Sequence, residues 1–293
     1  MVTLEQKRQH PKVALTDLDE LWFQVAGTLC NLACAHCFIS CSPTNDTHKL
    51  ISKERMFTAL EEAKQRGVKE YYFTGGEPFL HPNLLEFIER TVEQGPLTVL
   101  TNGILITDRM AQKLAELAEG TPYSLDFRIS LDGLTPEEND EIRGKGTFEK
   151  IIRSVKRLYL HGINPIITVT EVREGMGAAA ERSKFIELLR TFGIQQPRLK
   201  FLTPFQIGEE AKRTSGYAPE EFVYEGDLVP GEDEWLQCAN ARMITEKGIF
   251  PCPILINHDD SKMGDSLTES EGAISLRWSA CYTCHVSGVT CRN

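Results

Sequence analysis

Three cysteines stand close together near the start of the chain, at Cys30, Cys34 and Cys37. Three thiolates on one short loop can bind three irons of a cubane iron–sulfur cluster and leave the fourth iron open to another ligand. The same cysteines also permit a zinc site, although zinc sites usually use CxxC pairs and four protein ligands. With Cys41 as a fourth thiolate, a ferredoxin-like electron carrier is a further alternative. Of these interpretations we favour the open cluster.

A second group of cysteines lies near the end of the chain, and its members are Cys238, Cys252, Cys281, Cys284 and Cys291. Residues 245–250 have the pattern of a hairpin that turns at Lys247-Gly248, which would bring the first two thiols to one side. The downstream CxxC pair then completes a site for one metal centre. Spacing alone permits either a zinc ion or an iron–sulfur cluster at this site.

Short polar motifs follow the expected strands. Thr74-Gly75-Gly76-Glu77-Pro78 combines two glycines, which let the backbone approach a ligand closely, with a carboxylate that can receive an ammonium group. The others are Thr101-Asn102-Gly103, Ser130-Leu131-Asp132-Gly133 and Ile142-Arg143-Gly144-Lys145-Gly146. Each of these alone indicates a turn more readily than a ligand contact, but four motifs in this order are improbable by chance.

Strands and helices must position these motifs. The six strands are expected at residues 21–29, 71–74, 97–101, 126–131, 165–172 and 198–202. Between them we expect helices: one capped by Ser52 and ended by Gly67, one over residues 110–117, and one capped by Thr147 that runs to Gly162. This alternation predicts an α/β fold with a parallel sheet. Six βα units are too few for a closed eight-stranded barrel, so we expect a partial (β/α)6 barrel.

The pattern weakens between residues 205 and 230, where glycine and proline interrupt it. We therefore predict two domains, a partial barrel over residues 1–205 and a small cysteine-rich domain over residues 206–293. The second has few apolar residues, and a unit of this size usually needs a metal or another cross-link for stability.

Composition excludes several classes of protein. The chain has 293 residues, of which 41% are hydrophobic and 25% charged, as in ordinary globular proteins. A net charge of −10 would repel nucleic acid. We find no apolar stretch long enough to span a membrane and no signal peptide, so we expect a cytoplasmic protein. Clustered cysteines in such a chain favour metal ligation over disulfides.

The CxxxCxxC sequence after the first strand, followed by the GGE motif, resembles the radical S-adenosylmethionine (SAM) superfamily. The resemblance implies that SAM chelates the open iron and is cleaved reductively to a 5′-deoxyadenosyl radical, which abstracts a hydrogen from the substrate. It implies that Glu77 and its glycines hold the methionine amino group, that Arg143 pairs with the carboxylate, and that His36 replaces an aromatic residue against the adenine. The implied SAM-binding residues are His36, Gly75, Gly76, Glu77, Asn102, Ser130 and Arg143.

The second cysteine group resembles the auxiliary domain of SPASM/twitch radical SAM enzymes, and its shortened spacing is similar to the one-cluster twitch variant. The resemblance implies two [4Fe–4S] clusters in the whole protein. The best ligand set for the second cluster is Cys238, Cys252, Cys281 and Cys284, and Cys291 is an alternative to one of the last two. Cys41 is expected to be a structural thiol.

The predicted function is hydrogen abstraction from a small molecule or short peptide, with the auxiliary cluster binding the substrate or accepting an electron. A flavodoxin or ferredoxin is the expected electron donor. Because only about twenty residues precede the first strand, where many peptide maturases carry a leader-binding domain, a small molecule or short peptide is favoured. Peptide maturation stays open as an alternative. So does a non-catalytic iron–sulfur or zinc protein for electron transfer or scaffolding.

Overall fold

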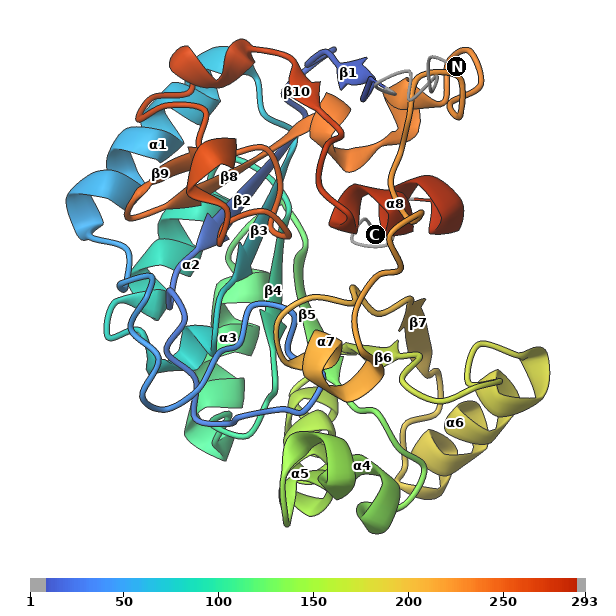
Figure 1. Ribbon diagram of the computed structural model, residues 1–293. Helices are drawn as coiled ribbons and strands as arrows, with labels where there is room; N and C mark the ends of the chain where they lie inside the picture. Colours follow the sequence, from blue (N-terminus) through green and yellow to red (C-terminus); the bar gives the residue numbers. More distant parts are fainter. Residues whose placement is uncertain (1–8, 289–293) are drawn as a thin grey trace, which may run out of the picture.

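The computed structural model describes residues 9–288, and its main feature is one eight-stranded sheet. The strands of this sheet are β2 (Glu20–Gln24), β3 (Glu70–Thr74), β4 (Leu97–Thr101), β5 (Leu125–Ser130), β6 (Ile166–Thr170), β7 (Arg198–Leu202), β8 (Ala241–Thr245) and β9 (Gly248–Phe250). Their order is β7-β6-β5-β4-β3-β2-β8-β9 (Figure 1). The six strands expected from the sequence all form and pair in parallel from β2 to β7. The α/β prediction is therefore confirmed.

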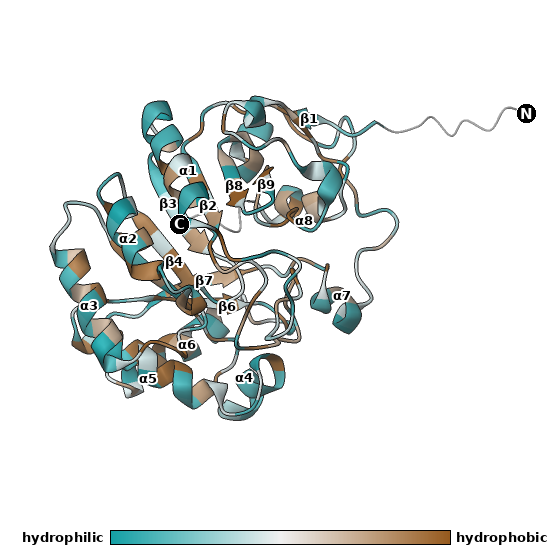
Figure 2. Cartoon of the chain, turned by 90° about the vertical axis from the view of Figure 1, so that its left-hand side faces the viewer, coloured by the Kyte–Doolittle hydropathy of each residue, from teal (hydrophilic) through white to brown (hydrophobic). Residues whose placement is uncertain are grey.

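Helices follow most of the strands and cover one side of the sheet. The helices are α1 (Lys53–Arg66), α2 (Leu84–Val92), α3 (Asp108–Glu119), α4 (Pro136–Arg143), α5 (Thr147–Leu160), α6 (Ala179–Thr191), α7 (Glu209–Thr214) and α8 (Ala280–Ser287). Short 3-10 turns lie at η1 (Pro78–Leu80), η2 (Asp233–Trp235), η3 (Gln237–Ala239), η4 (Asp259–Ser261) and η5 (Glu269–Glu271). Figures 1 and 2 both show α1, α2, α3, α5 and α6 along the outside of the sheet, with α7 and α8 on the opposite side.

The helix ends test the capping predictions. Ser52 caps α1 as expected, since its hydroxyl accepts a hydrogen bond from the Arg55 amide, and Gly67 ends the helix with φ +70°. The prediction that Thr147 caps α5 is wrong. Thr147 is the first helical residue, and its hydroxyl donates to Asp140 Oδ1 at 3.0 Å instead of accepting from the helix.

Residues of both sheet faces are buried, as expected for parallel strands covered on both sides. Phe23 and Phe73 belong to the large core between the sheet and the outer helices. Their neighbours Trp22 and Tyr72 point to the other face, where their rings stack with centroids 4.1 Å apart. Figure 2 shows the strands mostly in the hydrophobic colour and the outer helices with mixed faces. This alternation leaves the inner face available for a site.

The C-terminal region extends the same sheet. β8 pairs in parallel with β2, and β9 pairs antiparallel with β8, so the sheet crosses the boundary predicted at residue 205. A separate two-stranded sheet joins β1 (Lys12–Val13) to β10 (Ile274–Ser275). Thr245 pairs with Gly248, so the hairpin turns at Glu246 and Lys247, one residue earlier than predicted. Within residues 9–288, no helix has the length and apolar character needed to cross a membrane.

Candidate active site and C-terminal thiol site

The three N-terminal cysteines lie on the loop that leaves the carboxyl end of β2, and we call them the loop thiols: Cys30, Cys34 and Cys37. All three line one cavity of about 220 Å³ on the inner side of the sheet. Of the ten residues predicted for this site, only Glu77 is absent from the cavity wall. The others that line it are His36, Gly75, Gly76, Asn102, Ser130 and Arg143.

Hydrogen-bond donors surround the loop thiols. The Leu32 amide donates to Cys30 Sγ at 3.4 Å, and the Cys41 amide donates to Cys37 Sγ at 3.2 Å. Arg143 Nη1 lies 4.0 Å from Cys34 Sγ. Donors of this kind stabilise thiolates, which are the form of cysteine that binds metal.

The pKa values of the loop thiols also describe a metal-binding site. Burial raises the pKa of Cys30 to about 12 and that of Cys34 to about 11. A hydrogen bond from the Cys41 side chain lowers the pKa of Cys37 to about 6. Buried thiols of raised pKa ionise only when a cation compensates the charge, so metal binding at this site is coupled to proton release. The residues therefore fit the iron–sulfur cluster that the cysteine spacing implies.

The two glycines after β3 bring a second loop against the thiol loop. Gly75 has φ +130°, and a Cβ on Gly76 would lie 2.0 Å from the carbonyl oxygen of Leu29. At this close approach, the Gly76 amide donates a hydrogen bond to the carbonyl oxygen of Gly27, and the Glu77 amide donates one to the carbonyl oxygen of Leu29. Because no side chain separates these backbones, the glycines lie in the wall of the cavity beside Cys30.

Glu77 has a different position from the one expected. Its carboxylate is fully buried and accepts hydrogen bonds from Thr101 Oγ1 at 2.7 Å, the Asn102 amide at 2.8 Å and the Phe79 amide at 3.1 Å. Burial raises the pKa of Glu77 above its ordinary value, although the three hydrogen bonds act to lower it. The carboxylate thus ties the loop after β3 to the loop after β4, and the backbone of Gly75 and Gly76 is what faces the cavity.

Arg143 and His36 meet at one buried carboxylate, Asp132. Arg143 Nε lies 2.6 Å from Asp132 Oδ2, and His36 Nε2 donates to the same oxygen at 2.7 Å. Asp132 Oδ1 accepts from the Thr170 amide at 2.8 Å. Burial favours the neutral acid, but Arg143 and His36 outweigh it and hold the pKa of Asp132 below its usual range. Asp132 therefore stays ionised and fixes two cavity side chains.

Asn102 and Ser130 complete the wall at the ends of β4 and β5. Asn102 Nδ2 donates to Asn31 Oδ1 at 2.8 Å and lies 3.9 Å from Cys30 Sγ. Sequence reasoning quoted Asp132 and Thr101 within their motifs without giving them a role, and it did not single out Asn31. The signal for Asp132 was present, since a carboxylate after a buried strand needs a cationic partner.

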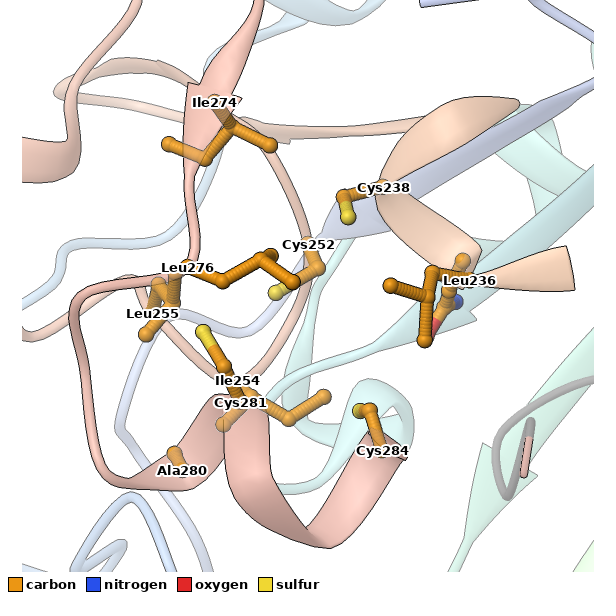
Figure 3. A pocket seen from close by; sticks show the side chains of 11 residues that line it. Leu236, Cys238, Cys252, Ile254, Leu255, Ile274, Leu276, Ala280, Cys281 and Cys284 are labelled. Atoms are coloured by element: carbon orange, nitrogen blue, oxygen red, sulfur yellow. The ribbon is translucent and has the colours of Figure 1, made fainter. Parts of the chain in front are cut away.

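The second cysteine group forms what we call the C-terminal thiol site: Cys238, Cys252, Cys281 and Cys284. Cys238 lies in η3 before β8, Cys252 follows β9, and the last two belong to α8. The hairpin brings the first two together as predicted, and all four thiols line one cavity (Figure 3). Cys291 lies outside the described residues.

Apolar side chains enclose the C-terminal thiol site. Its lining includes Leu236, Ile254, Leu255, Ile274, Leu276 and Ala280 (Figure 3). Burial raises the pKa of Cys238 to about 11 and that of Cys281 to about 12, and it raises the pKa of Cys252 further. As in the loop site, ionisation of these thiols requires a cation.

The spacing of the side chains bears on the kind of metal centre. Zinc holds thiolates about 2.3 Å from one ion, which brings their sulfurs close together. In residues 9–288, no three His, Cys, Asp or Glu side chains come close enough to hold one metal ion. The four thiols nevertheless line one cavity, and four thiolates can bind either a zinc ion or an iron–sulfur cluster.

The parallel sheet and the loop thiols are those expected of an enzyme that binds an iron–sulfur cluster, and a comparison with known families supports this interpretation. The family described as the radical SAM superfamily matches residues 25–172, which is half of the chain. The protein therefore belongs to the radical SAM superfamily, whose members use a [4Fe–4S] cluster and SAM. The matched residues contain the loop thiols and the three motifs that follow β3, β4 and β5.

Individual relatives add detail. The mycofactocin maturase MftC of Mycobacterium tuberculosis is 34% identical over 229 residues, which cover 75% of this chain and 52% of MftC. The chain thus spans about half the length of the curated relative it matches. Among solved structures, anSMEcpe with bound AdoMet has a TM-score of 0.62 and 17% identity, over 86% of this chain and 79% of that one. Streptococcus suis SuiB bound to the precursor peptide SuiA has a TM-score of 0.63 and 17% identity, over 86% and 63%.

Proposed function

We propose that this protein is a radical SAM enzyme that abstracts a hydrogen atom from a small molecule or a short peptide. The observation that carries the proposal is that the loop thiols, the glycine pair and Arg143 share the wall of one cavity. When bound by the loop thiols, a [4Fe–4S] cluster supplies the electron that cleaves SAM to methionine and the 5′-deoxyadenosyl radical. The six strands from β2 to β7 are then the partial (β/α)6 barrel of this class.

The protein residues bind and orient SAM. Cys30, Cys34 and Cys37 would hold three irons of the cluster, and the fourth iron would be open to SAM. Arg143 is fixed by Asp132 and presents its remaining donors to the SAM carboxylate. The cavity-facing backbone of Gly75 and Gly76 would accept the methionine ammonium group, since the Glu77 carboxylate already accepts three hydrogen bonds from the protein.

His36, Ser130 and Asn102 complete the proposed SAM site. His36 lies in the cavity wall at the position before Cys37, where relatives place an aromatic residue against the adenine. Its hydrogen bond to Asp132 fixes the ring plane. Ser130 offers a hydroxyl to the ribose or the carboxylate, and Asn102 lies in the same wall with its Nδ2 3.9 Å from Cys30 Sγ.

We further propose that the C-terminal thiol site holds an auxiliary [4Fe–4S] cluster through its four cysteines, with Cys291 as an alternative ligand. The shared cavity of these thiols and its apolar wall support this assignment. We assign the cluster site to a C-terminal unit over residues 206–293. A small apolar cluster beside it includes Val223, Leu236, Ile254, Ile274 and Trp278 and also contains Val13 from the N-terminal region. A cysteine-rich unit with so small a core gains stability from its metal.

The substrate is proposed to enter the part of the cavity beyond the SAM site, which is lined by Trp22, Phe38, Thr168 and Phe205. MftC is named a maturase, and SuiB was solved with a precursor peptide, so a peptide substrate is one of the two classes we propose. The physiological reductant is proposed to be a flavodoxin or a ferredoxin.

The decisive experiment is anaerobic reconstitution followed by a search for SAM cleavage. We expect about eight irons per chain and dithionite-dependent formation of 5′-deoxyadenosine. A reconstituted protein that binds iron but forms no 5′-deoxyadenosine with any reductant would favour the non-catalytic alternative. Stoichiometric zinc at the C-terminal site would refute the proposed auxiliary cluster but would not affect the assignment of the loop site.

A further inference from the structure

One arginine of the C-terminal region is buried beside the thiols and has no acidic partner. Arg242 lies in β8 and has no exposed surface. Its guanidinium donates to four backbone carbonyls: Ser270 at 2.7 Å, Cys238 at 2.9 Å, Ala241 at 2.7 Å and Gly272 at 3.2 Å. These bonds use four of its five N–H donors but leave its positive charge uncompensated.

The groups that interact electrostatically with this charge are thiols. Across residues 9–288, Arg242 forms no ion pair with an Asp or Glu, and the ionisable groups that act on it are Cys238 and Cys252. A buried cation is costly unless an anion pairs with it, and the candidates here belong to the C-terminal thiol site.

We propose that Arg242 is the counter-ion of an anionic iron–sulfur cluster held by the C-terminal thiols, and that its charge raises the reduction potential of that cluster. This inference rests on the auxiliary cluster of the proposed function. Four thiolates carry more negative charge than the iron–sulfide core of an oxidised [4Fe–4S] cluster neutralises. A fixed cation nearby compensates this excess.

The same charge favours reduction of the cluster. One electron from a donor such as dithionite adds a further negative charge without breaking a bond. Attraction to Arg242 is therefore stronger in the reduced cluster than in the oxidised one, and the potential is higher than it would be without the guanidinium. Arg242 acts as a positioning residue that tunes this centre, because it reaches the cluster only across its ligands.

The test measures the potential of this one cluster. In a full-length background with Cys30, Cys34 and Cys37 all changed to alanine, iron bound after reconstitution belongs to the C-terminal site. An EPR redox titration in this background then reports one midpoint. We expect Arg242→Gln to shift the oxidation equilibrium at least tenfold toward the oxidised cluster, which for one electron is a fall of about 59 mV. A purely structural role would change stability and leave this midpoint in place.

Two further variants separate charge from hydrogen bonding. Arg242→Lys keeps the charge but cannot reach all four carbonyls, and we expect less than half of the glutamine shift. Arg55→Gln is a matched control, because Arg55 donates to the carbonyls of Thr245 and Asp265 in the same region. Cys238 and Cys252 are not influenced by Arg55 in the described structure, so its loss should leave the midpoint unchanged.

Each outcome is decisive. A midpoint in Arg242→Gln equal to that of the background, or a fall in Arg242→Lys as large as in the glutamine variant, overturns the inference. If the glutamine variant loses its iron, the test rests on Arg242→Lys alone. A midpoint equal to that of the background then supports the counter-ion role, and a tenfold shift of the equilibrium refutes it. A background that binds no iron refutes the auxiliary cluster itself, and iron analysis before the titration identifies this case.

Discussion

The loop site and the C-terminal thiol site both contain buried cysteines, but their surroundings differ. The loop thiols number three, receive hydrogen bonds from nearby amides, and face a cavity of about 220 Å³ with polar side chains in its wall. The C-terminal site gathers four thiols behind aliphatic side chains, with one buried cation beside them. The two sites therefore differ in the number of thiols assigned to them and in the polarity of the wall. Under the proposed function, these differences separate a cluster open to SAM from one enclosed by protein.

Removal of a loop thiol is expected to have the largest effect and tests most directly whether the two sites differ in role. Cys34→Ala should abolish 5′-deoxyadenosine formation, because two thiolates cannot hold the cluster, while about four irons stay at the C-terminal site. Iron analysis and chromatography of the products measure both effects. Cys41→Ser is the matched control, because the amide of residue 41 still donates to Cys37 Sγ and the serine hydroxyl can replace the Cys41 thiol as a donor to Cys37. Equal loss of activity in the control would show that Cys41 is a ligand.

Removal of a C-terminal thiol should have the next largest effect. This effect should be on the folding of the C-terminal region and not on the cluster of the loop site. Cys252→Ala should make residues beyond β9 sensitive to protease, because the small apolar core there depends on the metal. The loop cluster should retain about four irons per chain. Limited proteolysis followed by mass spectrometry locates the cleavage sites. A C-terminal region that resists protease in this variant contradicts the predicted dependence on metal.

A smaller effect is expected from the carboxylate that organises the loop site. Asp132→Asn should reduce the free energy of unfolding by about 3 kcal/mol, because it leaves the buried Arg143 charge uncompensated, and should weaken SAM binding. Because its folded pKa lies below the ordinary 3.8, the stabilisation is complete above about pH 3.8 and is lost as the pH falls through the folded value. Denaturant unfolding and equilibrium dialysis with SAM measure the two effects.

The control for that variant is Asp126→Asn. Asp126 pairs with Arg198 at 2.6 Å on the surface, where an ion pair contributes about 1 kcal/mol or less. Comparable losses in the free energy of unfolding would mean that the buried Asp132–Arg143 pair stabilises the protein no more than a surface ion pair does.

The smallest expected effect concerns backbone packing. Gly76→Ala should cost about 1–3 kcal/mol, because the added methyl group meets the Leu29 carbonyl at 2.0 Å and forces the two loops apart. Gly120→Ala at the end of α3 is the control: its φ is −79° and the nearest atom lies 3.4 Å away. Thermal unfolding of both variants, with iron content as a second measurement, tests whether the close approach holds the loop thiols in place.

Local sequence signals predicted the part of the structure that depends on neighbours in the chain. Alternating apolar runs located the six parallel strands, and Ser52 and Gly67 marked the ends of α1. Thr147 was misassigned because Asp140 competes for its hydroxyl, which no sequence pattern reveals. The pairing of β8 with β2 was also missed, since a short strand gives no indication of a parallel partner so distant in sequence.

The candidate site shows the same limit. The cysteine spacing predicted that Cys30, Cys34 and Cys37 share a cavity, which Cys41 also lines, but the sequence alone could not show that Glu77 accepts hydrogen bonds from the loop after β4. That contact joins motifs from two strands and depends on how the strands lie side by side. Asp132 is a similar case, because its partners come from the thiol loop and from α4.

The pairing of β8 with β2 has a consequence for biosynthesis. Glu20 has Ala241 as its partner, so this edge of β2 stays unpaired until the residues of β8 have left the ribosome. An uncovered strand edge is prone to pair with other chains. We therefore expect nascent molecules to depend on chaperones until β8 has been synthesised and pairs with β2.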